Sequence, residues 1–96
     1  MTLLERKVAI VTGGGTGIGK ESALALAQDG YAVTIAGRRA EMLEKTVKEA
    51  GSGVSILAVK TDVGDPESVK ELFSKTLEEF GRLDVLFNNA GGGAPK

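Results

Sequence analysis

The feature that most constrains this chain is a run of apolar residues that passes directly into a glycine-dense turn. Val8 to Val11 is followed by TGGGTGIG at 12–19, and a helix-like pattern begins at Lys20. An apolar run, a tight turn and a helix start together predict a buried strand, a loop and a helix. Glycines let backbone N–H groups approach an anion, and the helix N-terminus adds partial positive charge. The junction therefore predicts a phosphate cradle, with a nucleotide as its ligand.

The spacing of these glycines fits two nucleotide-binding patterns. Gly14 to Lys20 has the spacing of a P-loop, but the next residue, Glu21, replaces the hydroxyl that binds magnesium in that motif. A carboxylate there would also place a negative charge beside the triphosphate. Alternatively, Gly13, Gly17 and Gly19 form TGxxxGxG, a variant of the dinucleotide-binding glycine pattern. We favour the dinucleotide reading, with P-loop hydrolysis as the disfavoured alternative.

The remainder of the chain alternates strand and helix patterns without a linker. Strands are expected at 7–12, 31–36, 54–60 and 84–88, and helices at 17–29, 40–50 and 66–80. Short apolar strands separated by amphipathic helices predict a parallel sheet, and right-handed crossovers give the spatial strand order 3-2-1-4. The predicted fold class is α/β, a partial doubly wound sheet of the Rossmann type (βαβαβαβ). The first two helices are expected on one face and the third on the other.

Composition narrows the function classes. The 96 residues are 42% hydrophobic and 26% charged, with a net charge of −1, which is typical of one soluble globular domain at most. The scattered positive charges give no nucleic-acid footprint, and no run is long enough to cross a membrane. The absence of cysteine and histidine excludes a disulfide, a thiol nucleophile and a zinc cluster, so we expect no metal site. The start MTLLERK does not resemble a signal peptide, and we expect a cytoplasmic protein.

Three further motifs fall at the ends of the later predicted strands. They are Gly37-Arg38-Arg39, Asp62-Val63 and Asn88-Asn89-Ala90-Gly91. Ligands of doubly wound sheets bind at the carboxyl ends of the strands, where the strand order reverses. All of these motifs are therefore expected on the same edge as the glycine turn.

The chain resembles the short-chain dehydrogenase/reductase family from near its start to its last residues. The motifs that carry this resemblance are TGGGTGIG, GRR, DV and NNAG. The resemblance implies a nicotinamide dinucleotide cofactor and a small carbonyl or alcohol substrate. The cofactor-binding residues it implies are Gly13, Gly15, Thr16, Gly17, Ile18, Gly19, Arg38, Arg39, Asp62, Val63, Asn88, Ala90 and Gly91.

The charge after the second strand favours NADP(H) over NAD(H). An acid at this position would repel the 2′-phosphate of NADP, whereas Arg38, with Arg39 as second choice, can pair with it through charge-assisted hydrogen bonds. Thr16 occupies a position that is basic in some NADP-dependent relatives, so only one of two family signals is present. The competing interpretation is that both arginines are solvated charges at a helix start.

The remaining two motifs carry roles implied by the resemblance. Asp62 would accept a hydrogen bond from the adenine amino group and Val63 would pack on the ring, although a simple turn acid is the alternative. Asn88 would lie nearer the cofactor and Asn89 would be more structural, although Asn-Gly turn chemistry could also explain this composition.

The family's catalytic tyrosine and lysine have no counterpart here. The one tyrosine, Tyr31, begins the second predicted strand, and Ile35 stands where the lysine four residues later would be. We therefore expect the catalytic Ser, Tyr and Lys beyond Lys96, with residues 1–96 as the N-terminal dinucleotide-binding part of a longer reductase that forms a homo-oligomer. A non-catalytic dinucleotide-binding module is the alternative. The fourth strand should be an uncovered edge, which predicts that the isolated chain is marginally stable, prone to self-association or dependent on a complementing segment.

Overall fold

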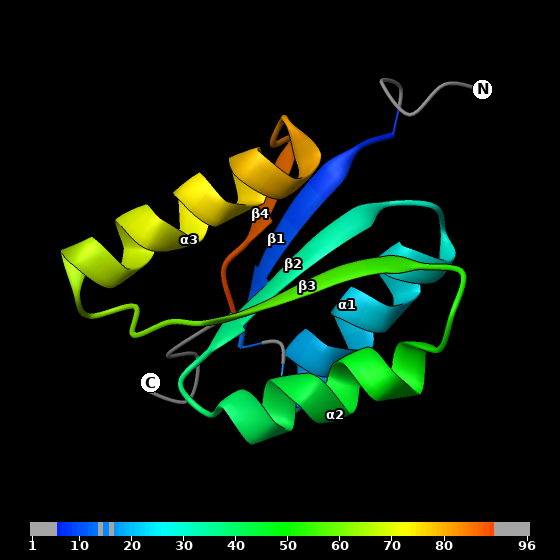
Figure 1. Ribbon diagram of the computed structural model, residues 1–96. Coiled ribbons are helices and arrows are strands. Elements are labelled where there is room, and N and C mark those ends of the chain that lie inside the picture. The colour runs from blue at the N-terminus through cyan, green and yellow to red at the C-terminus, as the bar shows by residue number, and fades with distance from the viewer. Residues whose placement is uncertain (1–5, 14, 16, 90–96) are drawn as a thin grey trace.

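The computed structural model describes residues 6–13, 15 and 17–89. Along the chain, the described residues form β1 (Val8–Thr12), α1 (Gly17–Gln28), β2 (Ala32–Gly37), α2 (Ala40–Ala50), β3 (Ser55–Lys60), α3 (Pro66–Phe80) and β4 (Val85–Phe87) (Figure 1). The helix starts and the element order agree with the sequence prediction, and the strand bounds differ by one residue at most ends.

All strand pairs in the sheet are parallel, and the order β3-β2-β1-β4 confirms the prediction. Ile10 pairs with Thr34 of β2 on one side and with Leu86 of β4 on the other, so β1 lies between them. The chain reverses direction across the sheet at β1, because β2 and β3 extend one way and β4 the other. This is the switch point at which doubly wound sheets bind ligands.

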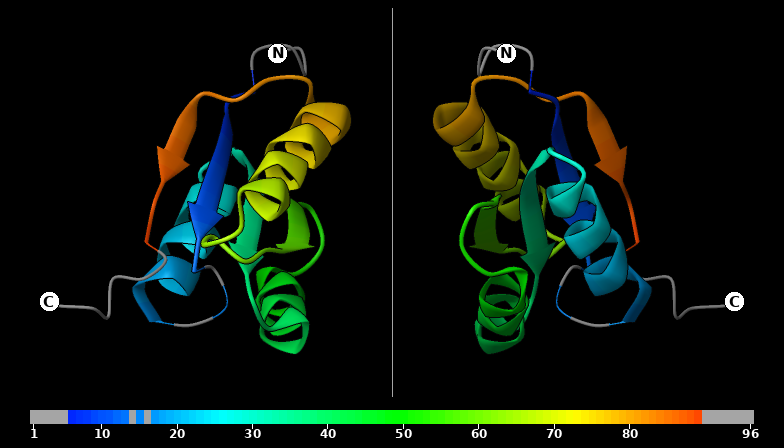
Figure 2. Two further views of the ribbon diagram at one scale, coloured as in Figure 1. Left: turned by 90° about the vertical axis from the view of Figure 1, so that its left-hand side faces the viewer. Right: turned by 90° about the vertical axis from the view of Figure 1, so that its right-hand side faces the viewer.

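The helices cover the two faces as predicted, with α1 and α2 on one side and α3 on the other (Figure 2). Successive strand residues divide between two cores because side chains alternate across a strand. Val11 and Ile35 pack with Leu43 of α2, whereas Ile10 and Ala36 pack with Leu72 of α3. Since β1 and β2 are buried on both faces, their near-continuous apolar sequences fit a parallel sheet.

The helix ends follow from local sequence. The Asp65 side chain accepts a hydrogen bond from the Glu67 amide at 3.1 Å, and Pro66 occupies the first turn of α3. Gly81 ends α3 with φ 84°, and Gly30 follows α1 with φ 100°. Both glycines adopt the left-handed region that other residues avoid.

The amino ends of β1 and β4 are joined by one carboxylate. The Asp84 carboxylate accepts a hydrogen bond from the Val8 amide at 2.8 Å, and the Asp84 amide donates to the Val8 carbonyl at 2.9 Å. Arg82 donates to both oxygens of Asp84, at 2.9 and 2.6 Å. The Arg82 hydrogen bonds, followed by the Val8 amide, hold the pKa of Asp84 below its ordinary value.

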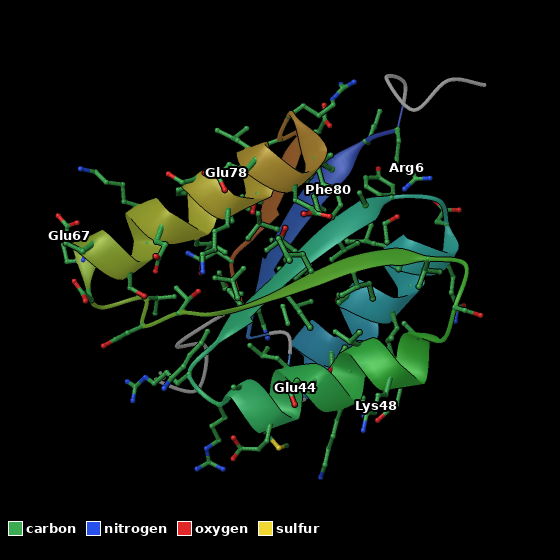
Figure 3. The ribbon with its side chains drawn as sticks, in the orientation of Figure 1. Arg6, Glu44, Lys48, Glu67, Glu78 and Phe80 are labelled. Atoms are coloured by element: carbon green, nitrogen blue, oxygen red, sulfur yellow. The ribbon has the colours of Figure 1, made fainter. Side chains whose placement is uncertain are left out.

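A second contact ties the sheet together at the same amino edge. Arg6 donates to the Ser55 hydroxyl at 2.6 Å, reaching from the start of β1 to the start of β3. Arg6 and Phe80 are seen at this end of the molecule in Figure 3. Side-chain contacts therefore hold the amino edge of the sheet together.

Two apolar side chains are more exposed than the sequence suggests, and the edge strand β4 is as exposed as expected. Ile18 is 69% exposed, because the first turn of α1 extends past the end of the sheet, and it does not join the apolar side predicted for that helix. Leu77 of α3 is 49% exposed, contrary to its expected place on the apolar face. In β4, Val85, Leu86 and Phe87 are 39%, 49% and 36% exposed, which confirms the uncovered edge strand.

Candidate functional site

The carboxyl ends of the strands gather at one edge of the sheet, toward the lower left of Figure 1. The glycine turn leaves β1 there, Arg38 follows β2, Asp62 follows β3 and Asn88 follows β4. The structure thus brings together the four motifs that the sequence predicts on this edge. Thr16, Ala90 and Gly91, also predicted as site residues, lie outside the described residues.

Close backbone packing explains the glycines of the turn. A Cβ on Gly19 would lie 2.1 Å from the Gly13 carbonyl oxygen, so the first turn of α1 rests against the loop backbone. Gly13 itself has φ 71°, and its amide donates to the Ala36 carbonyl at 2.7 Å. Gly17 begins α1 with φ 58°. These contacts draw the loop against the end of β2 and leave the α1 N-terminus facing the edge.

Gly15 packs against α2 rather than against the loop. A Cβ on Gly15 would lie 2.9 Å from the Cβ of Met42. Met42 was not a predicted site residue, because the helical pattern marks it only as part of an apolar face. A small pocket of about 130 Å³, here called the glycine pocket, is lined by Gly13, Gly15, Gly37, Arg38, Arg39, Met42 and Leu43.

Thr12 links the glycine turn to the end of β4. Its hydroxyl accepts a hydrogen bond from the Asn89 amide at 2.7 Å and lies 3.0 Å from the Asn88 side-chain oxygen, to which it donates. Thr12 is only 5% exposed, whereas the two asparagines are less buried, so these bonds are partly shielded from water. Sequence reasoning missed this role, although a threonine directly before the first motif glycine was the available signal. Both asparagines of NNAG are thus held near the glycine turn.

The two arginines after β2 are exposed and lie beside the glycine pocket. Arg39 is the N-cap residue of α2, and its carbonyl accepts the amides of Met42 and Leu43 at 3.1 and 3.2 Å. Among the described residues, no side-chain hydrogen bond caps this helix N-terminus. The ion pairs between described residues join Lys20 with Glu49 and Arg82 with Asp84, so neither Arg38 nor Arg39 is neutralised by a carboxylate within that part of the chain.

Asp62 is held in a turn that leads into α3. The Asp62 carbonyl accepts a hydrogen bond from the Asp65 amide at 2.9 Å, and its Oδ1 accepts one from the Gly64 amide at 3.0 Å. The Asp62 amide donates to the Ser68 hydroxyl at 2.8 Å. The following Val63 is 44% exposed. A hollow of about 390 Å³, here called the Asp62 hollow, is lined by Arg38, Lys60, Thr61, Asp62 and Ser68.

The lysine of the P-loop spacing does not face the loop. The Lys20 ammonium forms an ion pair with Glu49 of α2 at 2.7 Å. In a P-loop this lysine must reach the β- and γ-phosphates, and Glu21 would replace the hydroxyl ligand of magnesium. The geometry therefore disfavours triphosphate hydrolysis.

Tyr31 lies away from this edge. It precedes β2 at the amino side of the sheet, where its amide donates to the Leu26 carbonyl at 3.1 Å and its ring packs against the core. The length of β2, about 3.3 Å per residue, separates Tyr31 from Arg38 by roughly 20 Å. Within the described part of the chain, no group of three acidic, cysteine or histidine side chains could hold a metal. No helix there is long and apolar enough to cross a membrane.

Comparison with known proteins gives a consistent result. The profile of the short chain dehydrogenase family matches residues 7–96. An uncharacterised oxidoreductase of Listeria monocytogenes is 46% identical over 90 residues, which cover 92% of this chain and 36% of the relative. The chain therefore spans about a third of the length of such relatives.

Two solved structures are also similar. A variant of actinorhodin polyketide ketoreductase, solved with NADPH, has a TM-score of 0.88 and 37% identity, with 95% of this chain and 35% of that chain covered. An alcohol dehydrogenase from the archaeon Thermococcus sibiricus, solved with 5-hydroxy-NADP, has a TM-score of 0.80 and 44% identity, with 85% of this chain and 36% of that chain covered.

Proposed function

Because this chain belongs to the short chain dehydrogenase family, we propose that it is the NADP(H)-binding part of an oxidoreductase. The whole protein would transfer hydride between the nicotinamide and a small carbonyl or alcohol substrate. The observation that carries this proposal is the convergence of the glycine turn, Arg38 and Asp62 on one edge of the sheet.

The residues of this edge fit a dinucleotide. Gly19 packs so closely on the Gly13 carbonyl that a side chain would fill the space, which is how a cradle for a pyrophosphate is built. The exposed N-terminus of α1 offers backbone amides to the phosphates. Oδ1 of Asp62 already accepts the Gly64 amide, so its other carboxylate oxygen would accept a hydrogen bond from the adenine amino group. The exposed Val63 side chain would pack on the adenine ring. The cofactor supplies the hydride, while these residues bind and orient it.

The proposed preference for a 2′-phosphate is supported by arginine charge that no carboxylate among the described residues pairs with. Arg38 lines both the glycine pocket and the Asp62 hollow, so it lies between the places proposed for ribose and adenine. A guanidinium there can donate two hydrogen bonds to a 2′-phosphate. The uncapped N-terminus of α2 at Arg39 adds favourable potential for an anion. The NADPH-bound and 5-hydroxy-NADP-bound relatives are consistent with this choice.

We also propose that the catalytic Ser, Tyr and Lys follow Lys96 in the native protein. This part of the proposal is supported by Tyr31, the one tyrosine of the chain, which lies at the opposite edge of the sheet from the cofactor residues. Intact mass of the native protein, with the sequence after Lys96, tests it. A downstream YxxxK and serine are expected, and a native chain without them would overturn this part.

Cofactor choice is tested by calorimetric titration of the native protein with NADP⁺ and NAD⁺. We expect tighter binding of NADP⁺, and Arg38→Ala should weaken it by about 10- to 100-fold, because a hydrogen bond to a charged group contributes about 1.5–3 kcal/mol. NAD⁺ binding should hardly change. Arg39→Ala is the matched comparison and should have the smaller effect. Equal affinity for both dinucleotides in the wild type would contradict the preference, and absence of binding would contradict the function.

Turnover is tested by NADPH oxidation with a panel of aldehydes, ketones and acyl thioesters. We expect oxidation with at least one carbonyl class. Tight cofactor binding without oxidation, in a native chain lacking YxxxK, would instead point to a non-catalytic dinucleotide-binding protein.

A further inference from the structure

Lys60 ends β3 next to the proposed cofactor edge. It pairs in register with Gly37 of β2, and the following Thr61 amide donates to the Gly37 carbonyl at 2.7 Å. Neighbouring strands lie about 4.8 Å apart, and Arg38 follows Gly37 directly. Gly37 itself brings no side chain beside Lys60, and the side chain of Leu43 packs against it from α2. Lys60 and Arg38 both line the Asp62 hollow.

The charges lining that hollow do not cancel. Arg38 and Lys60 are positive and Asp62 is negative, which leaves one positive charge. Without Lys60 the lining would be neutral overall, and Asp62 would oppose any phosphate held by Arg38. Among the described residues, the two ion pairs involve neither Lys60 nor Arg38. Lys60 thus supplies the charge that makes the Asp62 hollow attractive to an anion.

We propose that Lys60 is a further specificity-determining residue, whose ammonium favours a dinucleotide carrying a 2′-phosphate over one without it. This inference rests on the proposed function, because it concerns the same cofactor. It extends the basic site from the residues after β2 to the end of the next strand. The lysine acts through charge, so its effect adds to the directed hydrogen bonds of Arg38.

Protection of the sheet edge is the competing explanation for Lys60. Since β3 is an edge strand, a lysine there can discourage pairing with another chain. Removing the lysine would then promote association and leave cofactor affinity unchanged. The two explanations therefore predict different measurements.

The test is calorimetric titration of the native protein with NADP⁺ and NAD⁺ at about 0.02 M and about 0.2 M salt, between which the Debye length falls from roughly 20 Å to about 7 Å. Lys60→Ala should weaken NADP⁺ binding about three- to fivefold at low salt, the range of an exposed ion pair, with a smaller effect at high salt. Lys60→Glu should weaken it by about tenfold or more, and Lys60→Arg should retain wild-type affinity. NAD⁺ binding should stay within error in all variants.

Lys48→Ala is the matched control, because it removes the same charge from the far end of α2, away from Arg38 (Figure 3). Its affinity for both dinucleotides should match the wild type. If Arg38→Ala weakens NADP⁺ binding but Lys60→Ala does not, the role of Lys60 is refuted and the proposed function stands. Equal weakening of both dinucleotides by Lys60→Ala also refutes it. A wild type that binds neither dinucleotide refutes the proposed function and this inference together.

Discussion

Replacement of Gly19 by alanine should damage the proposed cofactor cradle without unfolding the protein. The new Cβ would lie 2.1 Å from the Gly13 carbonyl oxygen and 3.0 Å from the Asn89 side-chain nitrogen. To restore even a 3.0 Å contact, the carbonyl must move by about 0.9 Å. Because the atom in the way is backbone, the whole glycine turn must shift.

The size of the effect follows from three contributions. Overpacking of this kind costs about 1–3 kcal/mol. Displacement of Gly13 would weaken its 2.7 Å bond to the Ala36 carbonyl, at a cost of about 1 kcal/mol. Alanine is better than glycine inside a helix by about 1 kcal/mol, which offsets part of the loss. The free energy of unfolding should therefore fall by about 2 kcal/mol, and NADP⁺ affinity should fall at least about tenfold, or about 1.4 kcal/mol.

Gly30→Ala separates stability from binding. Gly30 has φ 100° with no atom near its added Cβ, and it lies between α1 and β2 at the opposite edge. Its strain of about 1–2 kcal/mol should lower stability to a similar extent. Urea unfolding and calorimetric titration of both variants provide the assay. If Gly19→Ala binds NADP⁺ as tightly as Gly30→Ala does, the steric reasoning is wrong.

Three other outcomes are expected. Thr12→Val should lower the free energy of unfolding by about 1–2 kcal/mol in urea titrations, because the partly buried Asn89 amide loses its acceptor. Thr12→Ser should lose under about 1 kcal/mol, and equal losses would contradict the role of the hydroxyl. Because the pKa of Asp84 is lowered in the folded state, its contribution to the free energy of unfolding is full above about pH 5 and is lost as pH falls through that pKa. Asp84→Asn should flatten this part of the curve of stability against pH, and an unchanged curve would refute the role of Asp84. The isolated 96-residue chain should self-associate in sedimentation velocity, because the apolar edge strand β4 is exposed, and Leu86→Lys should reduce this association. A wild-type chain that stays monomeric at high concentration would contradict this role of the exposed edge.

The elements and their order could be predicted because local chemistry specifies them. Asp65 and Pro66 mark one helix start, Gly81 marks its end, and the apolar runs of β1 and β2 indicate strands buried on both faces. The strand order followed from the handedness of parallel crossovers. These signals lie within a few residues of one another, so sequence alone carries them.

The contacts that hold the site together could not be predicted in the same way. Thr12 meets Asn89 across 77 residues, and Lys20 meets Glu49 across 29, so their pairing depends on how the helices and strands finally pack. The exposure of Ile18 likewise depends on where the sheet ends relative to α1. Helical spacing alone placed Ile18 with the apolar residues.

The central position of β1 also has a consequence during synthesis. β1 pairs with β2 soon after both are made, but its other edge waits for β4, whose pairing residues begin at Val85. Between the completion of β3 and that of β4, 27 residues must be added, which takes about one to five seconds at typical elongation rates. During that interval the most apolar strand of the nascent sheet has an open edge, so this is the stage at which the emerging chain most needs protection from pairing with its neighbours.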